Sequence, residues 1–296
     1  MAAHSRSTLR VRDANLDLEV ACLDSTVLAS WRKSVADRRS VRVYDGRSVD
    51  SGTLGALEDL CRDHLTLSGG AARLDLVSGR DEADRVFSWL LGPLLRVIRG
   101  ATLTCLIVTS PDKDWHDEEA GFVGQQLVLE ATRLGLGTCW VSGTYNRKTA
   151  VTLANLQVDE HLACVIALGR PLSGSTGQSK RKTKKSIEAI CGKSREALEP
   201  WQFEALEYAR LAPSAVNFQP WWFEVSEDGR RPRVVLYDHN PRARRPWVRP
   251  TSGHLDRGIA MLNFLVGAAS AGVLGEWRML AGSGGRGPVA EYVIKE

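Results

Sequence analysis

One short segment gathers unusually many groups that could bind an anion. Arg38-Arg39-Ser40-Val41-Arg42 places three guanidinium groups and one hydroxyl within five residues. In an extended chain the side chains of Arg38, Ser40 and Arg42 project to the same side. Forked, charge-assisted donors of this kind suit the oxygens of a phosphate group. An exposed basic turn would have the same composition, so the segment alone leaves both interpretations open.

Two further segments combine small residues with polar ones. In 212–221, APSAVNFQPW, small side chains with an Asn and a Gln lie between two prolines, where a helix is followed by a strand. Such a run would let the backbone approach a flat polar ligand, although a plain loop is the simpler alternative. In 135–143, GLGTCWVSG, the glycines allow a left-handed helix end. We expect the turn that follows to point backbone N–H groups into a site.

The composition limits the other classes of site and partner. The chain has 296 residues, 43% of them hydrophobic, but no apolar run approaches the roughly 20 residues of a membrane span. The six cysteines and six histidines are scattered, without a CxxC pair or a helical HxxxH. This pattern predicts buried thiols in a reducing cytoplasm and no metal site. The net charge of +4 is modest, so the basic runs 179–185 and 230–249 do not predict a nucleic-acid partner.

Short strands and amphipathic helices must position these segments. Strands are predicted where β-branched and apolar residues lie between turn-forming ones, at 101–110, 161–169, 221–227, 233–238 and 291–296. Helices are expected over 53–64 and 201–210. In 121–134 the residues Val123, Leu127, Ala131 and Leu134 form one apolar stripe along a helix. The irregular mixture favours an α+β or α/β domain.

The sequence also resembles itself. The segments that end at Trp140 and Trp277 align with a shift of 137 positions, which also pairs Gly121 with Gly258. A second match, of the tripeptide ALE in two amphipathic helices, lies earlier in both copies. Two matches in the same order predict a tandem duplication with a join near 186–200.

Together, RRSVR, APSAVNFQPW and GLGTCWVSG resemble the three signature segments of the FMN-dependent nitroreductase family. VIALGRP at 165–171, followed by a basic stretch and SIEAI, resembles that family's C-terminal segment. The resemblance implies a nitroreductase-like α+β fold of two tandem half-copies, each a β-sheet flanked by helices, that form a pseudo-dimer within one chain. The implied parts are an N-terminal extension (1–29), a first half (30–190) and a second half (191–296).

The order of the motifs departs from the family pattern, in which PSxxNxQPW lies between the other two. The first half keeps RRSVR and GTCWVSG but reads LTLSGGAARLDLV at 65–77 where PSxxNxQPW should fall. The second half keeps PSAVNFQPW, lacks RRSxR, and has GVLGEWRML in place of GLGTCWVSG. The resemblance therefore implies one complete FMN site, shared between complementary halves, in a chain that need not dimerise.

The implied cofactor-binding residues come from both halves. By similarity to the family, the phosphate and ribityl oxygens would be held by Arg38, Arg39, Ser40, Arg42, Lys182 and Lys184. The flavin ring or ribityl would be lined from the opposite side by Pro213, Ser214, Ala215 and Asn217. The backbone N–H groups of Ser142 and Gly143 would face the flavin N5/O4 edge, with Trp140 and Val141 supporting them. No side chain is assigned as a general acid.

The implied activity is hydride transfer from NAD(P)H through FMN to a small electron-poor substrate, such as a nitroaromatic compound or a quinone. No GxGxxG motif is present, as expected if the nicotinamide stacks on the flavin without a domain of its own. Two alternatives stay open. One is a flavin-dependent dehydrogenase or flavin-modifying enzyme of a biosynthetic pathway, and the other is a non-catalytic protein that binds flavin or has lost it.

Overall fold

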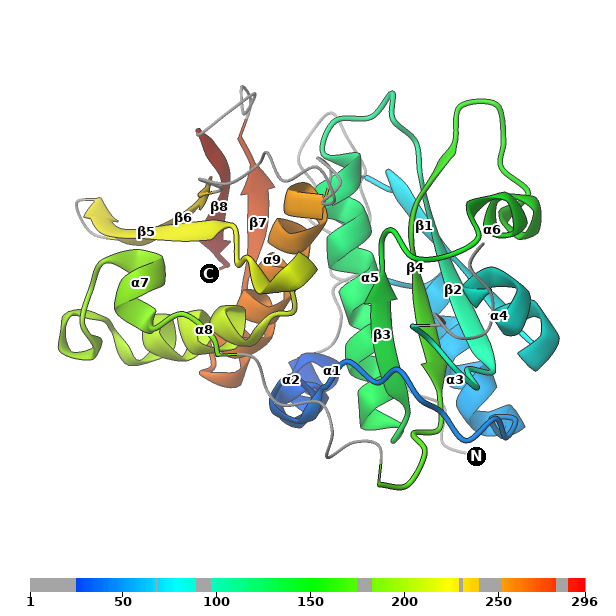
Figure 1. The fold of residues 1–296 in the computed structure, drawn as a ribbon. Coiled ribbons are helices and arrows are strands. Elements are labelled where there is room, and N and C mark those ends of the chain that lie inside the picture. The colour runs from blue at the N-terminus through cyan, green and yellow to red at the C-terminus, as the bar shows by residue number, and fades with distance from the viewer. Residues whose placement is uncertain are drawn as a thin grey trace.

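Helices and antiparallel strands are mixed along the chain, which confirms the α+β prediction (Figure 1). The computed structural model describes residues 25–67, 69–88, 97–174, 183–228, 231–239, 252–280 and 287–295. The elements up to residue 174 are α1 (Ser25–Ser30), α2 (Arg32–Asp37), α3 (Ser51–Arg62), β1 (Ala72–Ser78), α4 (Arg80–Phe87), β2 (Leu103–Thr109), α5 (His116–Arg133), β3 (Gly137–Val141), α6 (Arg147–Ala154) and β4 (His161–Gly169). Those that follow are α7 (Ile187–Cys191), the 3-10 turns η2 (Arg195–Ala197) and η3 (Ala215–Asn217), α8 (Pro200–Leu211), β5 (Trp221–Asp228), β6 (Arg231–Asp238), α9 (Ser252–Ser270), β7 (Gly275–Met279) and β8 (Pro288–Ile294).

The strands form two four-stranded sheets with the same internal order. The first sheet runs β1-β2-β4-β3 and the second β5-β6-β8-β7, so each places its first, second, fourth and third strand side by side. All of these pairings are antiparallel. Strand β2 is buried along its whole length because helices cover both faces of the first sheet, and its sequence LTCLIVT has no charged residue.

Local sequence signals set the helix starts. Asp50 caps α3, because its carboxylate accepts the backbone N–H of Thr53 at 2.9 Å. Helix α8 begins with a capping box between Glu199 and Gln202, with Pro200 in its first turn. The predicted helices at 53–64, 121–134 and 201–210 therefore correspond to α3, α5 and α8.

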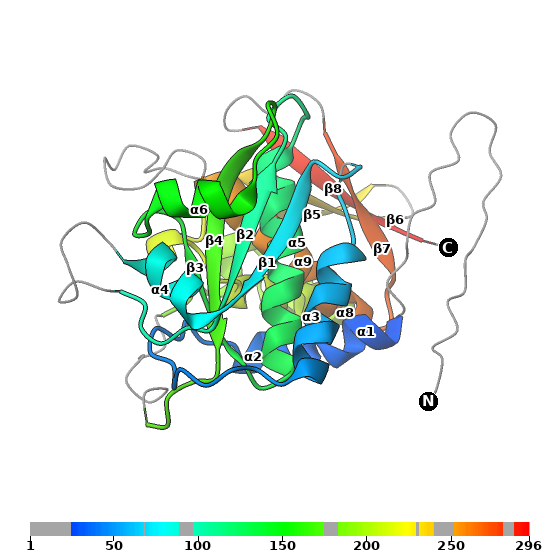
Figure 2. The same cartoon turned by 90° about the vertical axis from the view of Figure 1, so that its right-hand side faces the viewer.

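The long helices α5 and α9 lie side by side between the two sheets (Figures 1 and 2). A Cβ atom added at Gly121 would lie 2.0 Å from the carbonyl oxygen of Leu255, and one at Gly258 would lie 1.9 Å from that of Glu118. The two contacts are related by the same shift of 137 positions, since 258 − 121 and 255 − 118 are equal. The helices therefore meet backbone to backbone, and only glycine fits at both positions.

Polar contacts join the two sides of this helix pair. The buried Arg257 on α9 forms ion pairs with Glu118 on α5 at 2.6 Å and with Asp238 on β6 at 2.9 Å. Burial opposes ionisation of Glu118, but hydrogen bonds and charges from His254 and Arg257 lower its pKa to about 2. Near the N-terminus, the Arg32 guanidinium of α2 donates to the Tyr208 hydroxyl of α8 at 3.1 Å. The early helices thus pack against elements that lie far along the sequence.

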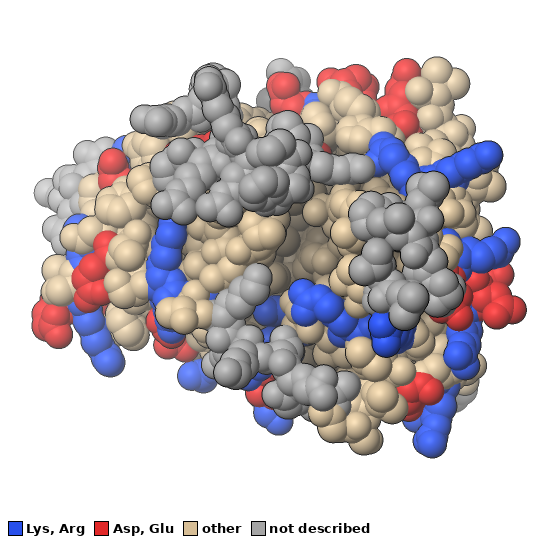
Figure 3. Space-filling view, in the orientation of Figure 1, with Lys and Arg blue, Asp and Glu red and all other residues tan. Residues whose placement is uncertain are grey.

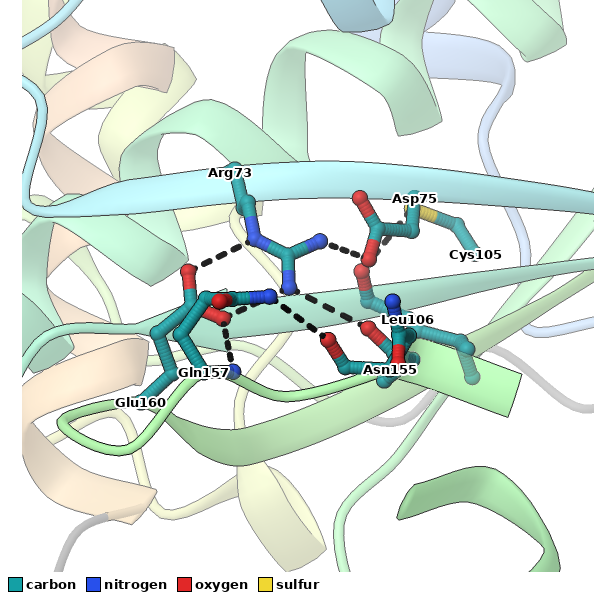
Figure 4. A network of polar contacts seen from close by, with 8 residues as sticks. Arg73, Asp75, Cys105, Leu106, Asn155, Gln157 and Glu160 are labelled. Atoms are coloured by element: carbon teal, nitrogen blue, oxygen red, sulfur yellow. Dashed lines mark hydrogen bonds and ion pairs between the residues drawn. The ribbon is translucent and has the colours of Figure 1, made fainter. Parts of the chain in front are cut away.

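Three strands were not predicted from the sequence. Gly135, with a φ of 79°, ends α5 in the left-handed conformation that the sequence predicted. The turn expected directly after it was wrong for 137–141, because Gly137 there packs closely against Val41 in the edge strand β3. Strand β1 carries the partly exposed charged residues Arg73 and Asp75 on one face. There Arg73 donates to both carboxylate oxygens of Glu160, at 2.8 and 2.7 Å, and pairs with Asp75 (Figure 4). Strand β7 (GEWRM) was missed because the charged residues Glu276 and Arg278 alternate with the others and break up any apolar run.

Three further predictions concern the boundary between the two halves, the cysteines and membrane spans. The expected boundary between residues 190 and 191 falls inside α7, which packs against α8 and β5 of the second half. The five described cysteines form no disulfide with one another, and four of them are buried as predicted. Within the described ranges, none of the helices is both long and apolar enough to cross a membrane.

The glycine contact makes a direct prediction. Gly121→Ala or Gly258→Ala would force a side chain against backbone that cannot yield, at a cost of about 3 kcal/mol or more. We expect each variant to lower the Tm by roughly 6–12 °C in thermal unfolding followed by circular dichroism. Gly55→Ala in α3 is the matched control, because a Cβ there meets nothing within 4 Å and Ala favours the helix. Variants at 121 and 258 as stable as that control would contradict the backbone contact.

Candidate cofactor-binding site

The RRSVR segment lies along the outer edge of β3. The Val41 N–H donates to the Thr138 carbonyl oxygen at 2.9 Å, and Ser40 forms a parallel bridge with Thr138. Val41 is buried, Ser40 is half-buried and Arg42 is exposed. The local chain is therefore extended beside β3, which is one of the two conformations that the sequence left open, and two of the expected site segments lie side by side.

This close approach depends on Gly137. A Cβ atom at that position would lie 2.8 Å from the Cβ of Val41, nearer than real Cβ contacts come. The buried Tyr44 holds the segment from its other end, because its hydroxyl donates to the Val41 carbonyl oxygen at 2.7 Å. The first glycine of GTCWVSG thus has a packing role that the sequence did not reveal.

The arginines of this segment divide into two roles. Burial raises the pKa of the Cys139 thiol on β3, while the charges of Arg42 and Arg38 act to lower it, so both guanidinium groups lie near this strand. Arg39 instead donates at 2.8 Å to the carbonyl oxygens of Ala36 and Arg38, and so covers the C-terminal end of α2. Arg38 and Arg42 remain the better candidates for holding an anion.

The rest of the GTCWVSG motif is anchored to the helix pair. The Trp140 indole donates to the Gln125 side chain at 3.3 Å, and Gln125 donates to Asn263 of α9 at 2.9 Å. Val141 is buried, and Ser142 and Gly143 follow in a partly exposed bend after β3. Among the described residues, the N–H groups of Ser142 and Gly143 have no hydrogen-bond acceptor. Both donors are therefore available to a ligand.

The PSAVNFQPW segment lies against residues 183–185. The Asn217 amide donates to the Thr183 carbonyl oxygen at 2.9 Å, and the Lys185 N–H donates to the Gln219 side chain at 2.9 Å. Lys184 donates through its ammonium group to the Ala212 carbonyl oxygen. The segment that carries Lys184 therefore lies beside the PSAVNFQPW loop. Lys182 lies outside the described residues.

The backbone of this loop is strained. Val216, Asn217 and Gln219 have φ values of 46°, 65° and 54°, in the left-handed region. Val216 is β-branched, so this conformation is unfavourable for it, and its side chain is nevertheless exposed. Strain of this kind persists where the surroundings impose it, which is common around ligand sites.

Asp256 is the residue that holds the loop and that sequence reasoning missed. It lies in the first turns of α9 and is buried, and the Ala215 N–H donates to its two carboxylate oxygens at 2.9 and 3.0 Å. Burial raises the pKa of Asp256 to about 8, although Ala215, Lys184 and Arg257 favour the charged form. The shift of 137 pairs it with Glu119, which accepts the Leu67 N–H at 3.2 Å. An acidic residue at both aligned helix positions was the available signal.

The two groups of residues face the same side of the molecule. Figures 1 and 2 show the turn that leads into β5 of the second sheet on the same side of the molecule as β3, the edge strand of the first sheet. Figure 3 shows the surface hollowed between the two halves on this side, with Lys and Arg side chains along its lower edge. The arrangement can present positive charge, backbone donors and small side chains to one ligand.

The raised pKa of Asp256 predicts how stability depends on pH. The carboxyl is neutral in the folded chain up to about pH 8 but ionises near pH 4 when unfolded, so its stabilising contribution falls as pH rises through that window. Asp256→Asn keeps an acceptor for the Ala215 N–H and does not titrate. Relative to the parent, we expect it to gain up to about 4 kcal/mol in free energy of unfolding between pH 5 and pH 8.

The measurement is urea unfolding of both proteins at several pH values. Asp59→Asn is the control, because the Asp59 side chain is 72% exposed. Parallel pH profiles for the parent and Asp256→Asn would contradict the assignment of a neutral buried carboxyl.

Comparison with known proteins identifies the family. Residues 32–268 match the family model described as "Putative TM nitroreductase". A putative nitroreductase from Thermotoga maritima is similar with a TM-score of 0.56 and 19% identity, over 90% of this chain and 92% of that chain. An FMN-bound nitroreductase from Bacteroides fragilis matches with a TM-score of 0.41 and 19% identity, over 53% of this chain and 95% of its own. No curated protein matches the sequence. The likeness to the Thermotoga protein shows the fold, and because the family match spans most of the sequence, the chain belongs to the putative TM nitroreductase family.

Proposed function

We propose that this chain is an FMN-dependent oxidoreductase that uses NAD(P)H to reduce a small electron-poor substrate, such as a nitroaromatic compound or a quinone. The observation that carries the proposal is the placement of RRSVR along β3 and of PSAVN on the same face. Membership of a nitroreductase family supports a flavin oxidoreductase. The names of similar structures, which include an FMN-dependent nitroreductase from Clostridium difficile, favour FMN as the flavin.

The donor set of the site fits FMN. Arg38 and Arg42 bring two positive charges to the edge of β3, which suits a terminal phosphate. Ser142 and Gly143 offer backbone N–H groups without protein acceptors among the described residues, which suits the polar edge of a flavin ring. When bound, FMN would supply the two-electron redox chemistry.

The chain's own residues would bind and orient the cofactor. Arg38, Ser40 and Arg42, with Lys182 and Lys184 from the segment after β4, would hold the phosphate and ribityl oxygens. Pro213, Ser214, Ala215 and Asn217 would line the opposite side, in the loop that Asp256 holds through Ala215. Because Arg39 covers the end of α2, its contribution would be to position Arg38 rather than to contact the phosphate.

We also propose that the two halves are copies of one unit and form a pseudo-dimer within the chain. The shared strand order of the two sheets supports this, as does the pair of glycine contacts related by 137 positions. The equivalent hydrogen bonds of Glu119 and Asp256 to the loops that precede β1 and β5 give further support. Each half keeps the motifs that the other has lost, so one FMN site per chain is expected. Location in the cytoplasm and the absence of a nucleic-acid partner stay predictions.

The proposed cofactor is tested by the absorbance spectrum of the purified protein and by chromatography of the flavin released on denaturation. We expect FMN, and bleaching of its absorbance by NADH or NADPH without oxygen. Recovery of FAD, or a colourless protein that FMN cannot reconstitute, would contradict the proposal. Bound FMN that neither nicotinamide nucleotide reduces would favour a dehydrogenase or a non-catalytic flavoprotein instead.

The roles of the arginines are tested separately. Arg38→Ala and Arg42→Ala should each weaken FMN binding by about 1.5–3 kcal/mol, roughly 10-fold to 100-fold in Kd, because each removes a charge-assisted donor. The loss should be smaller at high salt, which screens exposed charge. Quenching of flavin fluorescence measures the Kd. Arg47→Ala is the matched control, because Arg47 is exposed and pairs only loosely with Asp45 at 3.9 Å. Equal affinity in all three variants would show that Arg38 and Arg42 do not hold the flavin phosphate.

A further inference from the structure

Three side chains that the proposed flavin chemistry does not use converge at the start of α5. They are His116 and Asp117, the first two residues of that helix, and His161, the first residue of β4. One potential metal-ligand atom from each lies within 4.8 Å of the others. The two histidine rings are edge to face, with their centroids 5.6 Å apart. His116 and His161 are 45 positions apart in the sequence, so the cluster could not be recognised from the spacing of its residues.

The fold builds the cluster from the ends of two paired strands. Thr109, the last residue of β2, is in register with His161, and its hydroxyl lies 3.1 Å from the ring nitrogen Nε2. The loop after β2 then turns back through Trp115, which has a φ of 61°. A bulky residue rarely adopts this left-handed conformation, and strain of this kind concentrates at functional sites. Here it aims His116 and Asp117 at His161.

A hydrogen bond fixes the tautomer of His116. Its Nδ1 lies 2.9 Å from the Lys113 carbonyl oxygen, which can only accept, so Nδ1 carries the proton. The other nitrogen, Nε2, then keeps its lone pair and lies 3.9 Å from a carboxylate oxygen of Asp117. Metal-binding histidines commonly donate their second nitrogen to a carbonyl in this way.

Asp117 supplies negative charge in a buried place. Its side chain is only 8% exposed, and the next residue along the helix, Glu118, is also acidic and buried. Glu118 has a cationic partner in Arg257, at 2.6 Å, and Arg257 also pairs with Asp238 at 2.9 Å. A buried carboxylate with a carboxylate neighbour is costly unless a cation or a proton compensates it.

We propose that His116, Asp117 and His161 bind one divalent transition-metal ion, most readily Zn²⁺. Two imidazoles and a carboxylate are donors that Zn²⁺, Co²⁺ and Ni²⁺ accept, whereas Mg²⁺ and Ca²⁺ prefer oxygen ligands alone. His116 and His161 are partly exposed, so further coordination positions are open to solvent. The ion would tie the start of β4 to the start of α5. None of the three residues is among those proposed to hold the flavin.

The test is a Co²⁺ titration of the full chain, prepared without an added histidine tag and stripped with a chelator that is then removed. We expect visible d–d absorption that saturates at one Co²⁺ per chain and disappears when Zn²⁺ is added. His116→Gln, Asp117→Asn and His161→Gln should each weaken Co²⁺ binding at least about 10-fold. His64→Gln is the matched control, because that histidine contacts the Cys61 carbonyl oxygen instead, and it should bind Co²⁺ like the parent.

Thermal stability with Zn²⁺ and flavin content distinguish loss of the metal site from misfolding and from failure of the proposed function. His116 begins a helix at a partly exposed position, so His116→Gln should fold even if a substitution at buried Asp117 does not. Zn²⁺ should raise the Tm of the parent and of His64→Gln but not that of His116→Gln, since only a bound ligand stabilises the folded state. No saturable absorption, or equal affinity in the parent and both His116→Gln and His161→Gln, would overturn the proposal. Flavin content, measured on the same samples, reports on the proposed function separately.

Discussion

The backbone contact between α5 and α9 governs the arrangement of the whole molecule. Gly121 and Gly258 let the two helices meet without side chains between them. This contact sets how closely the two sheets approach, because α5 covers one sheet and α9 the other (Figure 1). It also brings the start of α9 next to α5, where Arg257 can reach Glu118. A side chain at either glycine would push α5 and α9 apart, and with them the two sheets that they cover.

The candidate site depends on that contact from both sides. On one side, Trp140 of β3 is linked through Gln125 to Asn263 of α9, so the strand beside RRSVR is tied to the helix pair. On the other side, Asp256 of α9 holds Ala215 of the PSAVN loop. The loop keeps a strained Val216 and a buried carboxyl, features that cost stability. Proteins commonly accept such costs where a ligand must be bound.

Local patterns in the sequence predicted some of the elements that carry the site and missed others, while the roles of the site motifs stay a prediction. Strands β4 and β6 and helix α5 were evident from the apolar patterns in HLACVIALG, VVLY and 121–134. Strand β3 was taken for a turn, since its Gly137 is required by the approach of Val41, a contact between segments almost 100 residues apart. Asp256 was missed because nothing local distinguishes a buried acidic residue from an exposed one at the start of a helix.

The central claim is that one flavin lies between two halves of a single chain. Native mass spectrometry of the FMN-saturated protein tests it most directly, because it counts chains and flavins in the same ion. The account predicts a monomer that carries one FMN at every protein concentration. Two flavins on one chain, or flavin found only on dimers, would contradict it.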